Sequence, residues 1–138
     1  MSYNQIAQIN LLFQIVILVV VLSGLVLKKF RKLLLHGRMM FLGAILNLIS
    51  FLTVMGPSLL SLGVSGTEQF SERSVIVLAH ASTGSVALVV ACLVTVRWRL
   101  KSSIDDCVKR KPVMRLVAVL WPVALVLGVL LYMILYLF

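Results

Sequence analysis

One face of a long apolar stretch carries the side chains with the most informative chemistry in this chain of 138 residues. His36, Met40, Gly43, Asn47 and Ser50 recur at spacings of three and four residues, which places them on one side of a helix. Two interpretations stand. Small and polar residues let membrane helices approach closely and hydrogen-bond across the contact. The same side chains would also form one wall of a cofactor or ligand pocket.

His80 is the second candidate for chemistry. It lies about six residues inside another apolar stretch, or about 9 Å along a helix. Gly84 follows one turn later, and Ala87 and Ala91 continue this face, which leaves the space that a porphyrin lying against a helix needs. Histidine is a common axial ligand of haem iron. His80 is therefore either a haem or metal ligand, with haem b as the candidate cofactor, or a neutral histidine that bonds a serine or a carbonyl on a neighbouring helix.

No self-contained catalytic set is present in the sequence. It has no Ser/His/Asp set at a credible spacing, no HExxH pair and no glycine-rich phosphate loop. The two cysteines, Cys92 and Cys107, are too far apart for a CxxC site and do not form a disulfide framework. All four carboxylates lie outside the apolar stretches, at Glu68, Glu72, Asp105 and Asp106. We expect a protein that is not an enzyme.

The elements that position these residues are membrane helices. Hydrophobic residues make up 62% of the chain and charged residues 12%, against about 45–50% and about 25% in soluble domains. The sequence predicts one domain over residues 1–138, an all-α integral membrane protein. Its fold is an up-down antiparallel four-helix transmembrane bundle. The helices are expected at about 6–27, 35–60, 74–96 and 112–137.

Turn and breaker residues refine this organisation. Gly56 and Pro57 indicate a turn near the end of the second helix. Pro112 suits the first turn of the fourth helix. Trp121 precedes Pro122 inside that helix, where the proline favours a kink, and Trp121 and Gly84 join the candidate pocket or packing residues.

The basic residues predict the orientation. Twelve of the thirteen Lys and Arg residues lie in the segments 28–34 and 97–111 or near the start of the helix that follows each segment. The exception is Arg73. Basic residues concentrate in short cytoplasmic loops. We therefore expect a multi-pass protein of the cell membrane with both termini outside and both basic loops in the cytoplasm. The net charge of +9 is then a topology signal with some attraction to anionic lipid, and nucleic acid is not an expected partner.

In this topology the two histidines do not share one iron. His36 lies at the cytoplasmic edge and His80 in the outer third, about 20 Å apart along the membrane normal. Each would need another partner, such as Met, Lys, Cys, water or a residue of another chain.

An ordered series of motifs resembles the YozB/CtaM family of small four-helix membrane proteins. The series consists of the runs 35–40 (LHGRMM), 78–81 (LAHA), 111–115 (KPVMR), 120–122 (LWP) and 128–136 (GVLLYMILY). Members of this family are associated with the maturation of haem–copper terminal oxidases. The resemblance implies that His36 and His80 match two family histidines with haem or metal contact. A histidine-basic pair that the family usually has at the start of the fourth helix is replaced by Lys109, Arg110 and Lys111.

The resemblance, together with the absence of a self-contained catalytic set, implies an accessory or assembly subunit of a larger membrane-bound respiratory metalloenzyme, in particular a haem–copper terminal oxidase. Its partners would be the larger membrane subunits of that complex and lipids. Two alternatives are a small b-type cytochrome with His80 as axial ligand and a small channel or transporter. No acidic residue lies within a predicted span, which argues against proton-coupled transport.

Overall fold

Four long helices make up the computed structural model, which describes residues 3–58, 60, 72–98 and 109–136. The helices are α1 (Tyr3–Lys29), α2 (Leu33–Ser50) with its π-helical continuation η1 (Phe51–Met55), α4 (Glu72–Trp98) and α6 (Lys111–Tyr136). Each contains a segment long and apolar enough to cross a membrane, which takes about 20 residues. The predicted all-α fold is confirmed, and the chain is a multi-pass membrane protein.

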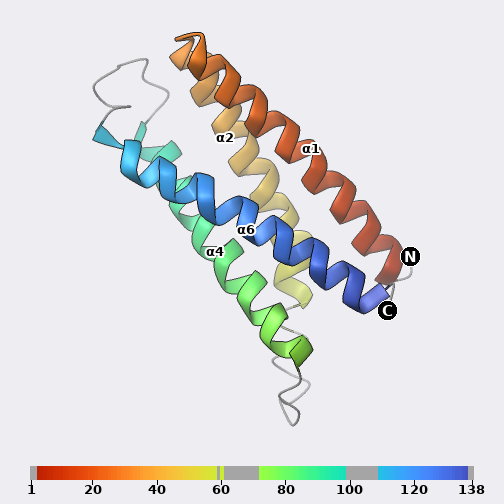
Figure 1. The fold of residues 1–138 in the computed structure, drawn as a ribbon. Helices are drawn as coiled ribbons and strands as arrows, with labels where there is room; N and C mark the ends of the chain where they lie inside the picture. Colours follow the sequence, from red (N-terminus) through yellow and green to blue (C-terminus); the bar gives the residue numbers. More distant parts are fainter. Residues whose placement is uncertain (1–2, 59, 61–71, 99–108, 137–138) are drawn as a thin grey trace.

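The helices run alternately up and down in two hairpins (Figure 1). Within the hairpins α1 packs closely on α2 and α4 on α6, and α2 joins the two hairpins through its contact with α4. The basic ends of all four helices meet at one end of the bundle, and the N- and C-terminal ends lie at the other (Figure 1). Most of the predicted basic loop 97–111 lies outside the described residues.

Close helix approach in the first hairpin depends on glycine. A Cβ at Gly43 would meet Val21 Cγ2 at 2.9 Å, and a Cβ at Gly24 would meet Met40 Cε at 2.6 Å. The turn that reverses the chain is short, since α2 begins only four residues after α1 ends. Arg31 in this turn has a φ of 58°, a left-handed conformation that a non-glycine residue adopts only where the turn demands it.

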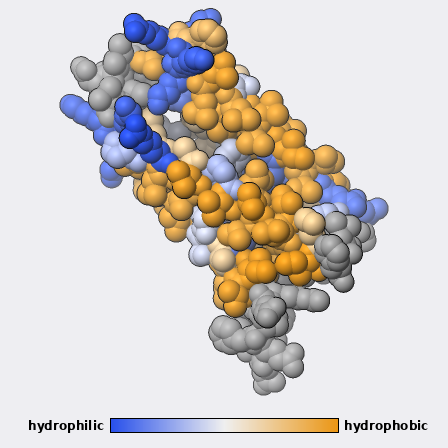
Figure 2. All heavy atoms as spheres, in the orientation of Figure 1, coloured by the Kyte–Doolittle hydropathy of each residue, from blue (hydrophilic) through white to orange (hydrophobic). Residues whose placement is uncertain are grey.

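Large apolar side chains cover the outside of the bundle rather than its inside (Figure 2). Leu12 is 64% exposed and Val119 is 63% exposed, whereas the buried residues are mostly small or polar and Ile17 is the one large side chain with less than 2% exposure among those described. A surface of this kind suits hydrocarbon, and small residues let membrane helices pack closely.

Two prolines, Pro57 and Pro122, lie inside helical structure. Helical structure continues through Gly56 and Pro57 to Ser58, so the predicted turn there is wrong. The π-helical segment precedes it, and the Gly56 N–H bonds the Phe51 carbonyl five residues back; such segments re-space the backbone bonds of a helix. Pro122 lies within the continuous α6, and Pro112 occupies its first turn as expected.

Candidate functional site

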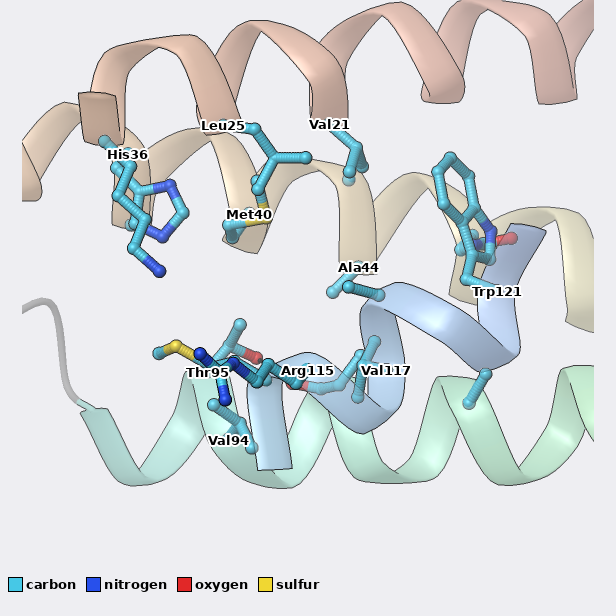
Figure 3. Close-up of a pocket in the computed structure, with 18 of the residues that line it drawn as sticks. Val21, Leu25, His36, Met40, Ala44, Val94, Thr95, Arg115, Val117 and Trp121 are labelled. Atoms are coloured by element: carbon cyan, nitrogen blue, oxygen red, sulfur yellow. Dashed lines mark hydrogen bonds between the residues drawn. The ribbon is translucent and has the colours of Figure 1, made fainter. Parts of the chain in front are cut away.

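A cavity of about 470 Å³ lies between the two hairpins. Its volume is within the range of about 300–1,000 Å³ of ordinary ligand sites. All four helices contribute side chains, which are predominantly apolar (Figure 3). On α2 the lining extends from Leu33 to Asn47, or about 20 Å of helix. The cavity therefore begins at the basic end of the bundle and reaches its middle.

His36 is the imidazole at this cavity. It is only 5% exposed, and its Nδ1 lies 2.8 Å from the carbonyl oxygen of Gly24 on α1. A carbonyl oxygen only accepts, so Nδ1 carries the proton and Nε2 of the neutral ring keeps its lone pair. No other described residue hydrogen-bonds the ring. Because no fully buried polar side-chain atom of the described residues lacks a partner, Nε2 is accessible from the cavity that His36 lines.

Cations surround the same end of the cavity. Lys28 from the end of α1 and Lys111 and Arg115 from the start of α6 line it, and Lys28 is close enough to interact electrostatically with His36. None of the described residues that line the cavity is acidic. Figure 3 shows His36 and Met40 on one side of the space and Arg115 on the other. This end of the cavity is therefore suited to a negatively charged group.

The predicted face of the second helix divides between two environments. Met40, Gly43 and Asn47 line the cavity together with His36, as does Trp121 from α6. Trp121 lies toward the end of the cavity opposite His36 (Figure 3). Of the candidate residues, Ser50, Gly84 and His80 do not line the cavity.

Ser50 belongs instead to a polar network between α1 and α2. Its hydroxyl donates to Asn10 Oδ1 over 2.6 Å and accepts from Gln14 Nε2 at 3.0 Å. Gln14 Nε2 also lies 3.3 Å from Asn47 Oδ1. These groups satisfy one another inside the hairpin, which is the helix-packing role that polar side chains have in membranes.

His80 occupies a different place from His36. Its Nδ1 lies 2.8 Å from the carbonyl oxygen of Ala124 on α6, and its ring lies against Gly128, where a Cβ would come within 2.8 Å of His80 Cε1. It does not line the cavity. The two histidines thus belong to separate hairpins, each bonded to a carbonyl of the neighbouring helix.

Sequence reasoning missed the functional grouping of Lys28, Lys111 and Arg115. These residues also predict the orientation of the chain in the membrane. The feature that could have marked them as a site is that each lies about one turn or less from a helix end, beside apolar residues. Which of the many basic residues meet across the bundle depends on helix rotation, and this does not follow from counting charges.

Comparison of the chain with protein-family models, curated proteins and solved structures finds no match. The resemblance to the YozB/CtaM family therefore stays a prediction from the motifs, and the role of the cavity is argued from its own chemistry.

Proposed function

We propose that this protein is an accessory or assembly factor for a larger membrane-bound respiratory metalloenzyme, a haem–copper terminal oxidase, and that it holds haem in the cavity at His36. The observation that carries the proposal is the His36 imidazole, fixed through Nδ1 to Gly24 with Nε2 open to the cavity. Metal-ligating histidines commonly donate their other ring N–H to a carbonyl or carboxylate, which fixes the ring and its tautomer.

The cavity residues fit a haem. His36 supplies an imidazole nitrogen, the apolar walls suit a porphyrin, and the cations at the basic end suit its propionate carboxylates. Bound haem would supply an iron centre for ligand exchange or electron transfer. The chain itself positions the imidazole, excludes water with apolar side chains and neutralises the acidic edge with Lys28, Lys111 and Arg115.

Among the described residues that line the cavity, His36 is the only imidazole. One fixed imidazole in a cavity between two hairpins holds a cofactor without enclosing it in a full ligand set, which is compatible with transfer to a partner. In the proposed orientation, the basic loops and the mouth of the cavity face the cytoplasm and both termini lie outside.

A small b-type cytochrome is the second candidate, and Met114 is the observation that favours it. Its side chain lines the same cavity from α6, on a different helix from His36, so an imidazole and a thioether from two helices would hold the haem, as in proteins with His/Met ligation. A channel or transporter has less support. Of the polar residues Asn10, Gln14, Asn47 and Ser50, which would form its polar stripe, Asn47 lines the cavity. Ser50 instead bonds Asn10 and Gln14 between α1 and α2.

Purification through a tag in a mild detergent tests the proposal. The eluate is examined by reduced-minus-oxidised absorbance and by protein identification, and the purified chain is titrated with haem. We expect large oxidase-type subunits in the eluate and a Soret band on titration. A lone chain with stoichiometric haem b would make it a cytochrome, and a chain that takes up no haem would overturn the haem site.

His36→Ala and His80→Ala form a matched pair for this titration. Both remove an imidazole that is bonded to a neighbouring helix, but only His36 lines the cavity. We expect His36→Ala to lose haem binding and His80→Ala to retain it. Loss only in the His80 variant would transfer the site to α4.

A further inference from the structure

The cavity has a property that haem binding does not require. Part of its wall is made of exposed side chains of α1. Leu22 and Leu25 both line the cavity, yet they are 50% and 43% exposed. Helices α1 and α6 flank the cavity, and they contact each other much less than the two helices within either hairpin do. A molecule in the membrane plane therefore has a lateral path between the hairpins.

The length of the cavity matches one leaflet. Its lining on α2 extends over about 20 Å, from the helix end at Leu33 to Asn47. Half of a bilayer of about 40–45 Å, headgroups included, has this thickness. The cations lie at the headgroup level and the apolar walls at the level of acyl chains.

The cations themselves lack anionic partners in the described part of the chain. Among the described residues, no ion pair involves Lys28, Lys111 or Arg115, and no acidic side chain lines the cavity. Arg110 differs from them, since its guanidinium donates to the Val94 carbonyl over 3.4 Å and it does not line the cavity. Basic pockets between membrane helices at this level bind anionic lipid headgroups.

We propose that the cavity is a binding site for an anionic phospholipid of the leaflet at the basic loops. Lys28, Lys111 and Arg115 hold its phosphate, and one acyl chain lies along the cavity past Met40 toward Trp121. This inference goes beyond the proposed function and holds whether or not the protein binds haem. Lipid and haem would occupy the cavity alternately, so that the lipid fills the apolar space before haem arrives.

Trp121 is a built-in reporter for this proposal, because it lines the cavity and the chain has only one other tryptophan, Trp98. A Trp98→Phe parent is reconstituted in phosphatidylcholine vesicles that contain acyl-brominated phosphatidylglycerol or, in a parallel sample, acyl-brominated phosphatidylcholine. Bromine quenches a nearby indole. We expect phosphatidylglycerol to be favoured at Trp121 by about fivefold or more, since each cation near the headgroups is worth about 1 kcal/mol.

Two charge-matched variants locate the preference. Lys111→Gln with Arg115→Gln removes two cavity cations, and Lys29→Gln with Lys32→Gln removes two exposed cations at the same end that do not line the cavity. We expect the preference for phosphatidylglycerol to fall severalfold in the first variant, where Lys28 is the remaining cavity cation, and to persist in the second. Equal quenching by both lipids in the parent, or equal loss in both variants, would overturn the proposal in favour of general surface attraction.

Native mass spectrometry gives a second measurement that does not depend on fluorescence. We expect one retained phosphatidylglycerol per chain in the parent and in Lys29→Gln with Lys32→Gln, and a severalfold lower retained fraction in Lys111→Gln with Arg115→Gln. Circular dichroism checks that each variant is helical. His36→Ala separates the two proposals: it should lose haem and keep the lipid preference, and a parent that binds haem without lipid selectivity would overturn the lipid site alone.

Discussion

The imidazole of His80 fills the place that a side chain at position 128 would need: a Cβ on Gly128 would lie 2.8 Å from His80 Cε1 and 3.3 Å from its Nδ1. The same ring is tied to the Ala124 carbonyl one turn earlier. His80 and Gly128 thus form a matched contact between α4 and α6, and the histidine has a structural role that requires no ligand.

This contact predicts a coupled pair of substitutions. Gly128→Ala should destabilise the protein by about 1–3 kcal/mol, the usual cost of overpacking, because a rigid aromatic ring and not a flexible chain end must move. His80→Ala removes the obstacle, so Gly128→Ala should cost little in that background. Thermal unfolding in detergent, followed by circular dichroism, measures the double-mutant cycle, and additive effects would contradict the contact.

The glycines of the predicted packing face should differ in their sensitivity. Gly43→Ala brings a methyl group within 2.9 Å of Val21 Cγ2, whereas Gly84→Ala meets only Ala124 Cβ at 3.9 Å. A β-branched valine has few alternative rotamers. We expect Gly43→Ala to lower stability by about 1–3 kcal/mol and Gly84→Ala to be neutral in the same unfolding assay. A reversed order would show that the hairpins pack differently.

The polar network in the first hairpin should contribute measurably to stability. Ser50→Ala removes bonds to Asn10 and Gln14 on α1, and interhelical hydrogen bonds in membranes average about 0.6 kcal/mol with a maximum of about 1.7. Ser23→Ala is the control, since that hydroxyl bonds only the Val19 carbonyl of its own helix. Unfolding in detergent should show a loss of about 1–2 kcal/mol for Ser50→Ala and little change for the control. Equal losses would argue against the network.

Met114 distinguishes a haem carrier from a cytochrome. If one imidazole carries the binding, Met114→Leu should change haem affinity less than tenfold and leave the spectrum of the bound haem unaltered. A cytochrome that holds haem through His36 and Met114 would lose its low-spin spectrum and shift its reduction potential in this variant. Titration of the purified Met114→Leu protein, followed by absorbance and redox potentiometry, separates the two.

The orientation in the membrane predicts that both termini face outward. A short epitope tag at either end should be labelled on intact cells or spheroplasts, and a cysteine at Lys29 should react with an impermeant reagent only after lysis. Labelling of the termini only after lysis would invert the topology and place the mouth of the cavity on the other side.

The four spans could be predicted from the sequence because membrane helices need only length and apolarity, and the structure has them within a few residues of the predicted bounds. The residue spacing predicts that Met40, Asn47 and Ser50 share one face of the second helix, but it does not predict which of them line the cavity and which contact α1. Met40 and Asn47 line the cavity while Ser50 contacts α1, because a face is wide enough to meet two neighbours. The continuation past Gly56 and Pro57 depends on the π-helical segment, which has no simple sequence signature.

The contacts of the candidate site also depend on how distant parts of the chain pack. The spacing of His36 places it on the same helix face as Met40, but its hydrogen bond to Gly24 needs the short turn at Arg31, which returns α2 along α1 in a fixed register. The neighbourhood of Lys28, Lys111 and Arg115 joins residues more than 80 positions apart in sequence, so only the packing of the two hairpins brings them to one cavity.

Each hairpin contains one histidine that bonds the backbone of its neighbouring helix, His36 to Gly24 and His80 to Ala124, and neither bond crosses between the hairpins. This arrangement has a consequence for biogenesis. The first hairpin can complete its own polar pairing as soon as its two helices leave the insertion machinery, before the second hairpin has been synthesised. The join between the hairpins then forms last, and the membrane lipids present at that moment are the first molecules able to enter the space between them.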